Sequence, residues 1–308
     1  MNTNSWYDGL NDYKKITLVA NPETKKHTFT VELLDVETNN YNSIYEVYST
    51  HLSNRQTKFV EVLFSGGLDS EFALHTCLKL NIPVRAITAR LLVNNCPINT
   101  HDLYYSERFC RANNIEHKIV DIDAKTFFEN GDHIKYLEPY YITEAHVATL
   151  FKLLEMTTGF PILGGEYSWP WIHGKILSPH RHHFNQFDRF MKDNGINGIG
   201  NMIGHSLESN MTFIKEHLAI QTKLENENNK FIPILKQSIL NNLGYNISEP
   251  RLRSYGWERL RLENDNFNIN MYCRDLMIRF GTVESNIVWN TKIAQVLGSN
   301  PGSNSLHK

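Results

Sequence analysis

The stretch Val60-Glu-Val-Leu-Phe-Ser-Gly-Gly-Leu-Asp-Ser70 decides the fold class of this chain. It begins with a short, mostly apolar run, which is typical of a buried strand. Two consecutive glycines then allow the backbone to turn tightly. After the turn, apolar residues recur near helical spacing at Phe72, Leu74, Cys77 and Leu78. The stretch therefore predicts a buried strand, a glycine turn and a helix in succession.

Strand and helix patterns keep alternating downstream of this stretch. Further strands are expected at 84–89, 116–122 and 160–164, and helices at 101–114 and 143–157. Such alternation requires crossover connections, so we expect an α/β fold with a Rossmann-like parallel sheet and helices on both faces. Ligands of such sheets bind beyond the carboxyl ends of the strands. The informative residues are therefore those that follow Phe64, Ala89, Ile122 and Leu163.

The regions on either side of the α/β segment have different patterns. The N-terminal region is β-rich and predicts a hairpin between Ile16–Ala20 and Thr28–Leu33. The C-terminal region is mostly helical by pattern and becomes rich in arginine and aromatic residues. We therefore expect a β-rich lead-in, an α/β domain, a helical region and a flexible tail, with boundaries 1–57, 58–183, 184–297 and 298–308.

Charge and composition exclude several classes of protein. The chain has 308 residues, with 31 basic and 33 acidic side chains and a net charge of −2. No global basic field is therefore available to hold nucleic acid, although a local basic patch is compatible with this balance. No apolar run approaches the ~18 residues of a membrane-spanning helix, and the N-terminus lacks a signal-peptide pattern, so we expect a cytoplasmic protein. The four cysteines form no C-x-x-C pair and are expected to be free, mostly buried thiols.

The glycine turn has the properties of a phosphate site. Gly66 and Gly67 let backbone N–H groups approach a ligand without interference from a Cβ, and the next helix offers unpaired N–H groups and the positive end of its dipole. Ser65 and Ser70 add hydroxyl donors. Asp69 suits this place if it holds Mg²⁺ against the phosphates. The Walker motif is excluded because no Gly-Lys-Ser/Thr follows; a turn that uses Gly and Ser only to cap the helix is the alternative.

In this setting Ser65-Gly-Gly-Leu-Asp-Ser70 resembles the PP-loop signature of the N-type ATP pyrophosphatases, which have the adenine nucleotide alpha hydrolase-like fold. This superfamily includes asparagine synthetase, GMP synthetase, NAD synthetase, 7-cyano-7-deazaguanine synthase and the tRNA thiolation and lysidine enzymes. The resemblance covers approximately residues 58–170 and identifies 58–183 as a PP-loop ATP-binding domain. It implies ATP and Mg²⁺ as cofactors.

The resemblance also implies a reaction and a set of site residues. ATP is cleaved between its α and β phosphates, a substrate oxygen is adenylated, and a nucleophile, often ammonia, displaces AMP. By position in the motif, the residues that bind the pyrophosphate part are Ser65, Gly66, Gly67, Asp69 and Ser70, and Asp69 is also the metal ligand and a catalytic residue. Adenine would meet Ile87, Thr88 and Ala89 at the end of the second strand, largely through backbone groups.

A second turn, Gly164-Gly165-Glu166, follows the fourth predicted strand. It resembles the turn that asparagine synthetase places opposite the PP-loop, which makes Glu166 a second candidate catalytic residue that would assist magnesium or substrate. An ordinary turn is the alternative. The chain departs from asparagine synthetase where Tyr167-Ser168-Trp169 replaces an acidic residue. It also has no N-terminal cysteine nucleophile and lacks the cysteine cluster of deazaguanine synthase, which disfavours both a glutaminase activity and that enzyme.

Two other clusters remain open. His180–His183 contains adjacent histidines that rarely face one ion, so a solvated or substrate-facing loop is preferred to a metal site. Acidic residues nearly cancel the arginines of the aromatic-rich segment, so paired helix faces are preferred to an RNA surface. Candidates for neutralising the leaving pyrophosphate are Lys175, Lys192, Arg251, Arg253, Arg259, Arg261, Arg274 and Arg279.

The sequence thus favours an AMP-forming, ATP-dependent ligase that adenylates a small substrate for amidation or ligation, similar to asparagine synthetase but without a glutaminase domain. The alternatives are a PP-loop enzyme that modifies a nucleobase or tRNA, and a nucleotide-binding module that has lost catalysis. We expect ATP and a small molecule as partners and no membrane. Nucleic acid is disfavoured but is left open by the tRNA-modifying alternative. A separate ammonia donor and a homo-oligomer are compatible with this function.

Overall fold

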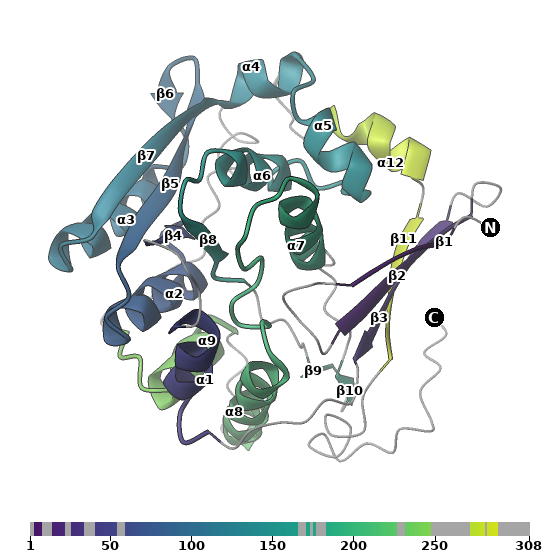
Figure 1. Cartoon of the computed structure of the whole chain (residues 1–308). Helices are drawn as coiled ribbons and strands as arrows, with labels where there is room; N and C mark the ends of the chain where they lie inside the picture. The colour runs from purple at the N-terminus through teal and green to yellow at the C-terminus, as the bar shows by residue number, and fades with distance from the viewer. Residues whose placement is uncertain are drawn as a thin grey trace.

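The computed structural model describes residues 3–7, 14–21, 26–33, 41–53, 59–165, 171–172, 175–176, 183–226, 232–247, 272–280 and 282–288. These residues form a five-stranded sheet, a four-stranded sheet and a two-stranded ribbon. The ribbon pairs β9 (Trp171–Ile172) with β10 (Lys175–Ile176) in antiparallel fashion. Figure 1 shows the five-stranded sheet with helices around it and the four-stranded sheet at one side.

The central sheet is built from the strands that the sequence predicted. Parallel pairing gives the order β7-β5-β4-β8, from β4 (Val60–Leu63), β5 (Val84–Val93), β7 (Glu116–Asp123) and β8 (Phe160–Leu163). The short β6 (Cys96–Pro97) folds back on the end of β5. Successive strands are added on one side of β4 and the last on the other, as in doubly wound folds, so the strand order reverses between β4 and β8. The predicted α/β fold class is confirmed.

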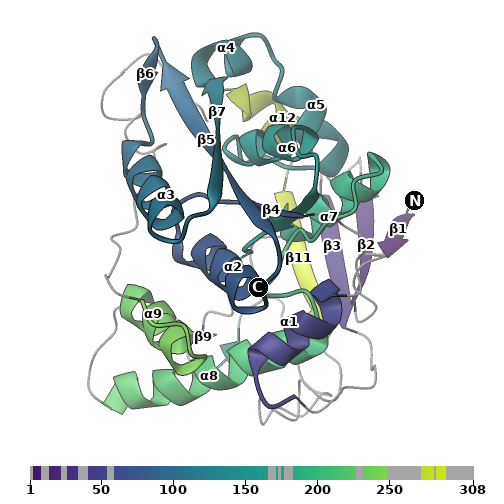
Figure 2. The ribbon, with the colours of Figure 1, turned by 60° about the vertical axis from the view of Figure 1, so that its left-hand side comes forward.

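Alternating side chains of the sheet divide the core into two layers. Val62, Phe64 and Ile162 pack in one cluster, whereas Leu63, Ile87 and Leu163 pack in the other. The first cluster includes residues of α1 (Ile44–Ser53), α2 (Leu68–Lys79), α3 (Thr100–Ala112), α8 (Leu207–Asn226) and α9 (Ile232–Asn242). The second includes residues of α4 (Ala124–Glu129), α5 (Ile134–Leu137), η1 (Glu138–Tyr140), α6 (Val147–Glu155), α7 (His183–Asp193) and α12 (Arg274–Phe280). Figure 2 shows α1, α8 and α9 together beside α2.

The second sheet joins the two ends of the described chain. Its order is β1-β2-β3-β11, from β1 (Thr3–Tyr7), β2 (Lys14–Asn21), β3 (Lys26–Leu33) and β11 (Thr282–Val288). The predicted hairpin is present as the antiparallel β2–β3 pair. The C-terminal region, which we expected to be helical, also contributes β11, which runs parallel to β3 (Figure 1).

Helix α1 lies inside the expected β-rich lead-in, yet it belongs to the core of the α/β unit. Val47 and Tyr48 are each 1% exposed, and the Tyr48 hydroxyl lies 2.8 Å from the Ser209 hydroxyl on α8. This helix therefore connects the lead-in to the helices that follow the sheet. The expected domain boundaries stay a prediction.

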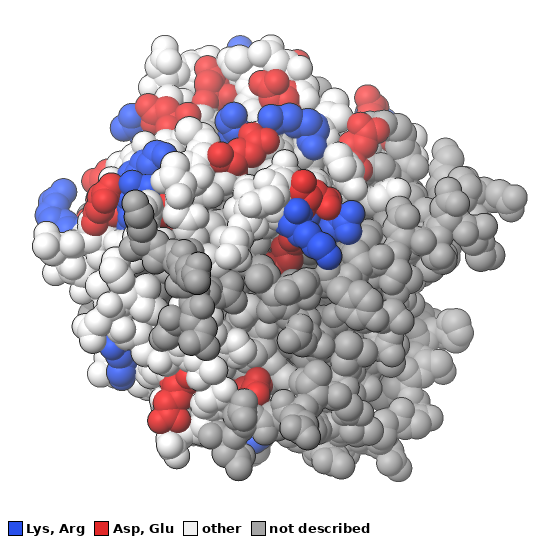
Figure 3. All heavy atoms as spheres, viewed as in Figure 1, with Lys and Arg blue, Asp and Glu red and all other residues white. Residues whose placement is uncertain are grey.

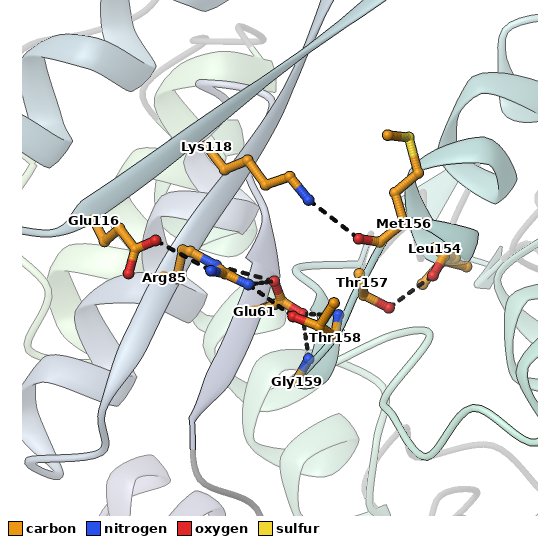
Figure 4. A network of polar contacts seen from close by, with 9 residues as sticks. All are labelled: Glu61, Arg85, Glu116, Lys118, Leu154, Met156, Thr157, Thr158 and Gly159. Carbon is orange, nitrogen blue, oxygen red and sulfur yellow. Dashed lines mark hydrogen bonds and ion pairs between the residues drawn. The ribbon is translucent and has the colours of Figure 1, made fainter.

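A buried ion pair fixes the amino ends of three strands (Figure 4). Glu61 of β4 is fully buried, and its carboxylate accepts hydrogen bonds from the Arg85 guanidinium on β5 and from the backbone N–H groups of Thr158 and Gly159. Arg85 also donates to Glu116 of β7 at 3.1 Å. The network secures the turn that leads into β8, at the opposite end of the strands from the glycine turn.

Three other sequence expectations can be compared with the described residues. All four cysteines are free; Cys77, Cys110 and Cys273 are buried and Cys96 is exposed. Within the described parts, none of the helices has the length and apolar character needed to span a membrane. On the face drawn in Figure 3, acidic and basic side chains alternate over the described surface without an extended patch of one sign.

Candidate functional site

The glycine turn lies where the strand order of the central sheet reverses. It follows β4, and the neighbouring strand β8 ends beside it at Leu163, directly before Gly164. The residue before the turn is held at both backbone atoms: the Phe64 N–H donates to the Ile87 carbonyl at 2.7 Å, and its carbonyl accepts from the Thr88 hydroxyl at 2.7 Å. The sheet therefore sets the position from which the turn begins.

Of the two glycines, Gly66 has the stricter requirement. Its φ of +72° lies in the left-handed region, and an added Cβ would come within 2.5 Å of the Asp102 carbonyl oxygen. Gly67 caps α2 with φ −80° and ψ 161°, and its Cβ would meet only the Ser65 hydroxyl at 3.2 Å. Gly66 is therefore needed for the passage of the backbone past α3, and Gly67 is free of that constraint.

The two serines of the turn have different environments. Ser65 is exposed, and its hydroxyl accepts from the Gly67 N–H at 3.4 Å. Ser70 is 6% exposed, and its hydroxyl donates to the Gly67 carbonyl at 3.1 Å. Ser65 is thus accessible to a ligand, whereas Ser70 closes the turn from inside. Their roles toward phosphate stay predictions.

The end of β8 packs directly on the first turn of α2. A Cβ on Gly164 would lie 2.5 Å from the Asp69 carbonyl and from the Ser70 backbone nitrogen. The Gly164-Gly165 turn therefore lies beside the glycine turn. Glu166 lies outside the described residues, as do His180 and Arg251, Arg253, Arg259 and Arg261, so the predictions about them stay predictions.

The carboxylate of Asp69 is bound by a lysine that the sequence analysis missed. Lys236 on α9 forms an ion pair with it, and the two side chains are 26% and 20% exposed respectively. The two residues are 167 positions apart in the chain. The available signal was a single cation within the apolar helical pattern Ile232-Pro-Ile-Leu-Lys-Gln-Ser-Ile-Leu240. This lysine joins the candidates for neutralising pyrophosphate.

Asp102 is a second residue near the turn that sequence reasoning missed. It lies in the first turn of α3, and its backbone approaches Gly66 as described above. Burial raises the pKa of its carboxyl to about 7, and a hydrogen bond with Asn99 opposes this shift. Asn99 in turn donates to the Ala89 carbonyl at 2.8 Å and accepts from the Leu91 N–H at 2.9 Å. The acid is thereby tied to the edge of β5.

The predicted adenine residues lie within a strand and not at its end. We expected the second strand to end at Ala89, but this is wrong: β5 continues to Val93 because β7 and β6 pair with it. The carbonyls of Ile87 and Ala89 already accept from Phe64 and Asn99, and the Thr88 hydroxyl lies 2.7 Å from His117 Nε2. Burial lowers the pKa of His117. Adenine contact at these residues stays a prediction.

The residues at the turn fit a magnesium–nucleotide complex. Asp69 offers the hard oxygen donor that Mg²⁺ prefers, and in nucleotide sites this ion takes its other ligands from phosphates and water. The described residues contain no group of three or more His, Cys, Asp or Glu side chains that could hold a metal ion. The close approach at Gly66 is to the Asp102 carbonyl, so glycine is required there by packing against α3.

Comparisons with known proteins give one relative and several structural neighbours. No family model matches the chain. A 7-cyano-7-deazaguanine synthase from Marinobacter nauticus is 29% identical over 128 residues, a match that covers 38% of this chain and 56% of the relative. Solved structures that resemble this one include a predicted subunit of tRNA methyltransferase from Methanocaldococcus jannaschii, at 19% identity and TM-score 0.32, covering 56% of this chain and 88% of that one.

Two synthetase structures are further neighbours. The NMN synthetase from Francisella tularensis has 14% identity and TM-score 0.30, covering 77% of this chain and 93% of that one. The ammonia-dependent NAD synthetase from Campylobacter jejuni has 16% identity and TM-score 0.30, covering 68% and 95% respectively. TM-scores of this size carry no argument about the fold, which rests on the strand order described above.

Proposed function

We infer a nucleotide-dependent enzyme, because the α/β unit of this chain belongs to the PP-loop ATP pyrophosphatase superfamily. The similarity to 7-cyano-7-deazaguanine synthase, which belongs to the same superfamily, confirms at that level the resemblance predicted from Ser65–Ser70. The match spans about half of that relative, 56% of its length, so substrate and reaction are proposed separately from the membership.

We propose that the chain binds ATP at the glycine turn and cleaves it between the α and β phosphates, releasing pyrophosphate and an adenylated substrate. The observation that carries this proposal is the Asp69–Lys236 ion pair beside Gly66, at the point where the strand order reverses. Crevices at such points are where α/β sheets bind their ligands. A carboxylate for a divalent cation, a cation for an anion and a glycine cradle are there on adjoining elements.

Each residue at the turn has a role in this proposal. Backbone N–H groups at Gly67 and the start of α2 bind the β and γ phosphates, helped by the positive end of the helix dipole. Asp69 holds Mg²⁺, which neutralises phosphate charge when bound. Lys236 carries positive charge toward the leaving pyrophosphate. The Ser65 hydroxyl is an additional accessible donor. These groups of the protein position the nucleotide and stabilise charge. Positioning and charge stabilisation account for most of the catalysis that such a transfer needs.

We propose a small substrate whose oxygen is adenylated and then displaced in an amidation or ligation. Asparagine synthetase-like specificity is one form of this proposal, and it rests on the Gly164-Gly165-Glu166 pattern. The second form is a heterocycle of the deazaguanine type, favoured by the name of the curated relative. A cytoplasmic location, a separate ammonia donor and a homo-oligomer accompany the proposal as predictions.

The position of ATP cleavage tests the reaction. The protein is incubated with γ-labelled ATP, Mg²⁺ and fractions of a metabolite extract, and the labelled product is identified. We expect the label in pyrophosphate, with AMP as the partner product. Label in orthophosphate with ADP would contradict the proposal. Asp69→Asn should lower the rate by about 10²–10³-fold, as loss of a charge-stabilising group does, whereas Glu116→Gln, at the far end of the strands, should leave it unchanged.

A further inference from the structure

Lys236 occupies Oδ2, one of the two oxygens that the Asp69 carboxylate offers to a cation. Its ammonium donates to Oδ2 of Asp69, the residue to which the proposed function assigns Mg²⁺. Both side chains are mostly shielded from water. An ammonium and a divalent cation on one carboxylate repel each other, because both are positively charged and lie close together. The two cations therefore compete for Asp69.

A nucleotide changes the balance of this competition. Phosphate oxygens bring negative charge to the glycine turn, directly before Asp69 in the chain. They give Mg²⁺ additional ligands, and they give the displaced ammonium a new anionic partner within reach of the same turn. Charge-assisted hydrogen bonds to phosphate are among the strong ones in proteins. The energy lost when Lys236 leaves Asp69 can therefore be recovered on the nucleotide.

A second contact keeps α9 in place while the first one changes. Tyr245, which follows α9, donates a hydrogen bond to Glu71 of α2, and the two residues are each 4% exposed. Ile239 and Leu240 of α9 are buried in the core beside α2. Burial raises the pKa of Tyr245, which keeps its hydroxyl as a donor. Helix α9 thus has an apolar attachment and a buried hydrogen bond that need not change, and one ion pair at the nucleotide turn.

We propose, on the basis of the proposed function, that Lys236 is an exchangeable counter-ion: it holds Asp69 in the nucleotide-free protein and moves to the phosphates when the magnesium–nucleotide complex binds. Metal alone then binds poorly, because it must displace the lysine without offering it another partner. Metal with nucleotide binds well, because the phosphates accept the lysine. The ion pair makes the Asp69 site selective for the complex over the free cation.

The proposal is tested by one variant in which two binding affinities should change in opposite directions. Lys236→Met keeps an unbranched side chain and removes the charge. Binding of Mn²⁺ alone, followed by electron paramagnetic resonance, should become about tenfold tighter, whereas calorimetric binding of Mg²⁺ with α,β-methylene ATP should become about tenfold weaker, the scale of one hydrogen bond to a charged group. Lys236→Arg should restore wild-type behaviour in part. Tyr245→Phe, which removes the hydrogen bond to Glu71 of α2 from the segment that follows α9, should change neither affinity in this way.

The outcomes separate this inference from the proposed function. If Lys236→Met weakens both affinities, the lysine has a structural role and the exchange is wrong. If metal alone binds more tightly and the nucleotide complex also binds as tightly or more tightly, the lysine merely repels the cation and the exchange is again wrong. If the wild-type protein does not bind Mg²⁺ with α,β-methylene ATP, the proposed nucleotide site itself fails.

Discussion

At the scale of single residues, the two glycines of the turn allow a test that separates folding from binding. Gly66→Ala places a Cβ 2.5 Å from the Asp102 carbonyl at a φ of +72°, so we expect a loss of at least the ~1–3 kcal/mol typical of a strained backbone. Gly67→Ala meets only the Ser65 hydroxyl, at 3.2 Å and negative φ. It should fold normally and weaken ATP binding by crowding the anion.

Thermal melts and calorimetric ATP titrations of both variants check this prediction. A Gly67→Ala protein with an unchanged melting temperature and unchanged ATP affinity would show that this turn is not the phosphate cradle. A Gly66→Ala protein as stable as wild type would contradict the close approach to Asp102.

The raised pKa of Asp102, another single residue, predicts that the stability of the protein depends on pH. Its pKa is raised from 3.8 to about 7 in the folded protein by burial. Its contribution to stability is therefore fully present below pH 3.8, where both states hold the proton, and is lost as the pH rises through about 7. Wild type should lose roughly 1–2 kcal/mol between pH 5 and pH 8 that Asp102→Asn does not lose, a figure reduced for the water that reaches the side chain.

Urea unfolding at the two pH values measures this difference. Glu129→Gln is the control, because Glu129 is an acid on α4 that is 48% exposed. Its pH dependence should equal that of wild type. If Asp102→Asn and wild type change in parallel between the two pH values, Asp102 ionises normally and the prediction is wrong.

At the scale of elements, the buried Glu61 contacts should contribute far more to the free energy of unfolding than the outer Arg85–Glu116 ion pair. Removing one partner of a buried ion pair leaves an uncompensated charge, at about 3–5 kcal/mol. Glu61→Ala should therefore lower the free energy of unfolding by that amount, because Arg85 and the N–H groups of Thr158 and Gly159 lose their acceptor. Glu116 is 71% exposed, so Glu116→Ala should cost less than about 1 kcal/mol.

Urea unfolding of the two variants measures their free energies of unfolding, and calorimetry measures their affinity for ATP. The network (Figure 4) lies at the amino ends of the strands. The glycine turn follows the carboxyl end of β4. A folded Glu116→Ala protein should thus bind ATP as wild type does. Equal losses of stability for Glu61→Ala and Glu116→Ala would mean that burial does not decide the strength of these contacts.

The elements that the sequence predicted correctly are those whose pattern is local. Residues 60–64 and 160–164 are short, mostly apolar runs, and 116–122 contains the apolar residues Ile119, Val120 and Ile122; each segment contains a strand. The end of β5 was misplaced because its last residues are held by β6 and β7, which local pattern does not reveal. Lys236 was missed for a related reason: only the three-dimensional fold brings it to Asp69, 167 residues away.

At the scale of the whole molecule, the sequence predicted the parallel α/β sheet and the glycine turn that follows β4, but not how the chain closes. The role of the turn toward phosphate stays a prediction. A glycine turn after a buried strand specifies its own geometry, so the motif carried both the fold class and the candidate site. The pairing of β3 with β11 joins segments near opposite ends of the chain. A strand such as Thr282–Val288 has the same pattern whichever sheet it enters, so its partner follows only from the three-dimensional fold.

Two truncations test whether this closure stabilises the molecule separately from the nucleotide site. Removing 282–308 deletes β11 and leaves the backbone edge of β3 without its parallel partner, and exposed strand edges of this kind promote association. Removing only 289–308 keeps β11 whole and serves as the control. The longer truncation should melt at a lower temperature and aggregate more than the shorter one. ATP affinity should agree within about twofold between them, since additivity holds for distant sites and both retain Gly66, Asp69 and Lys236. Light scattering, thermal melts and calorimetry measure these three properties. Equal melting temperatures would show that β11 does not stabilise the protein. A loss of ATP binding confined to the longer truncation would show that the second sheet and the nucleotide site form one cooperative unit.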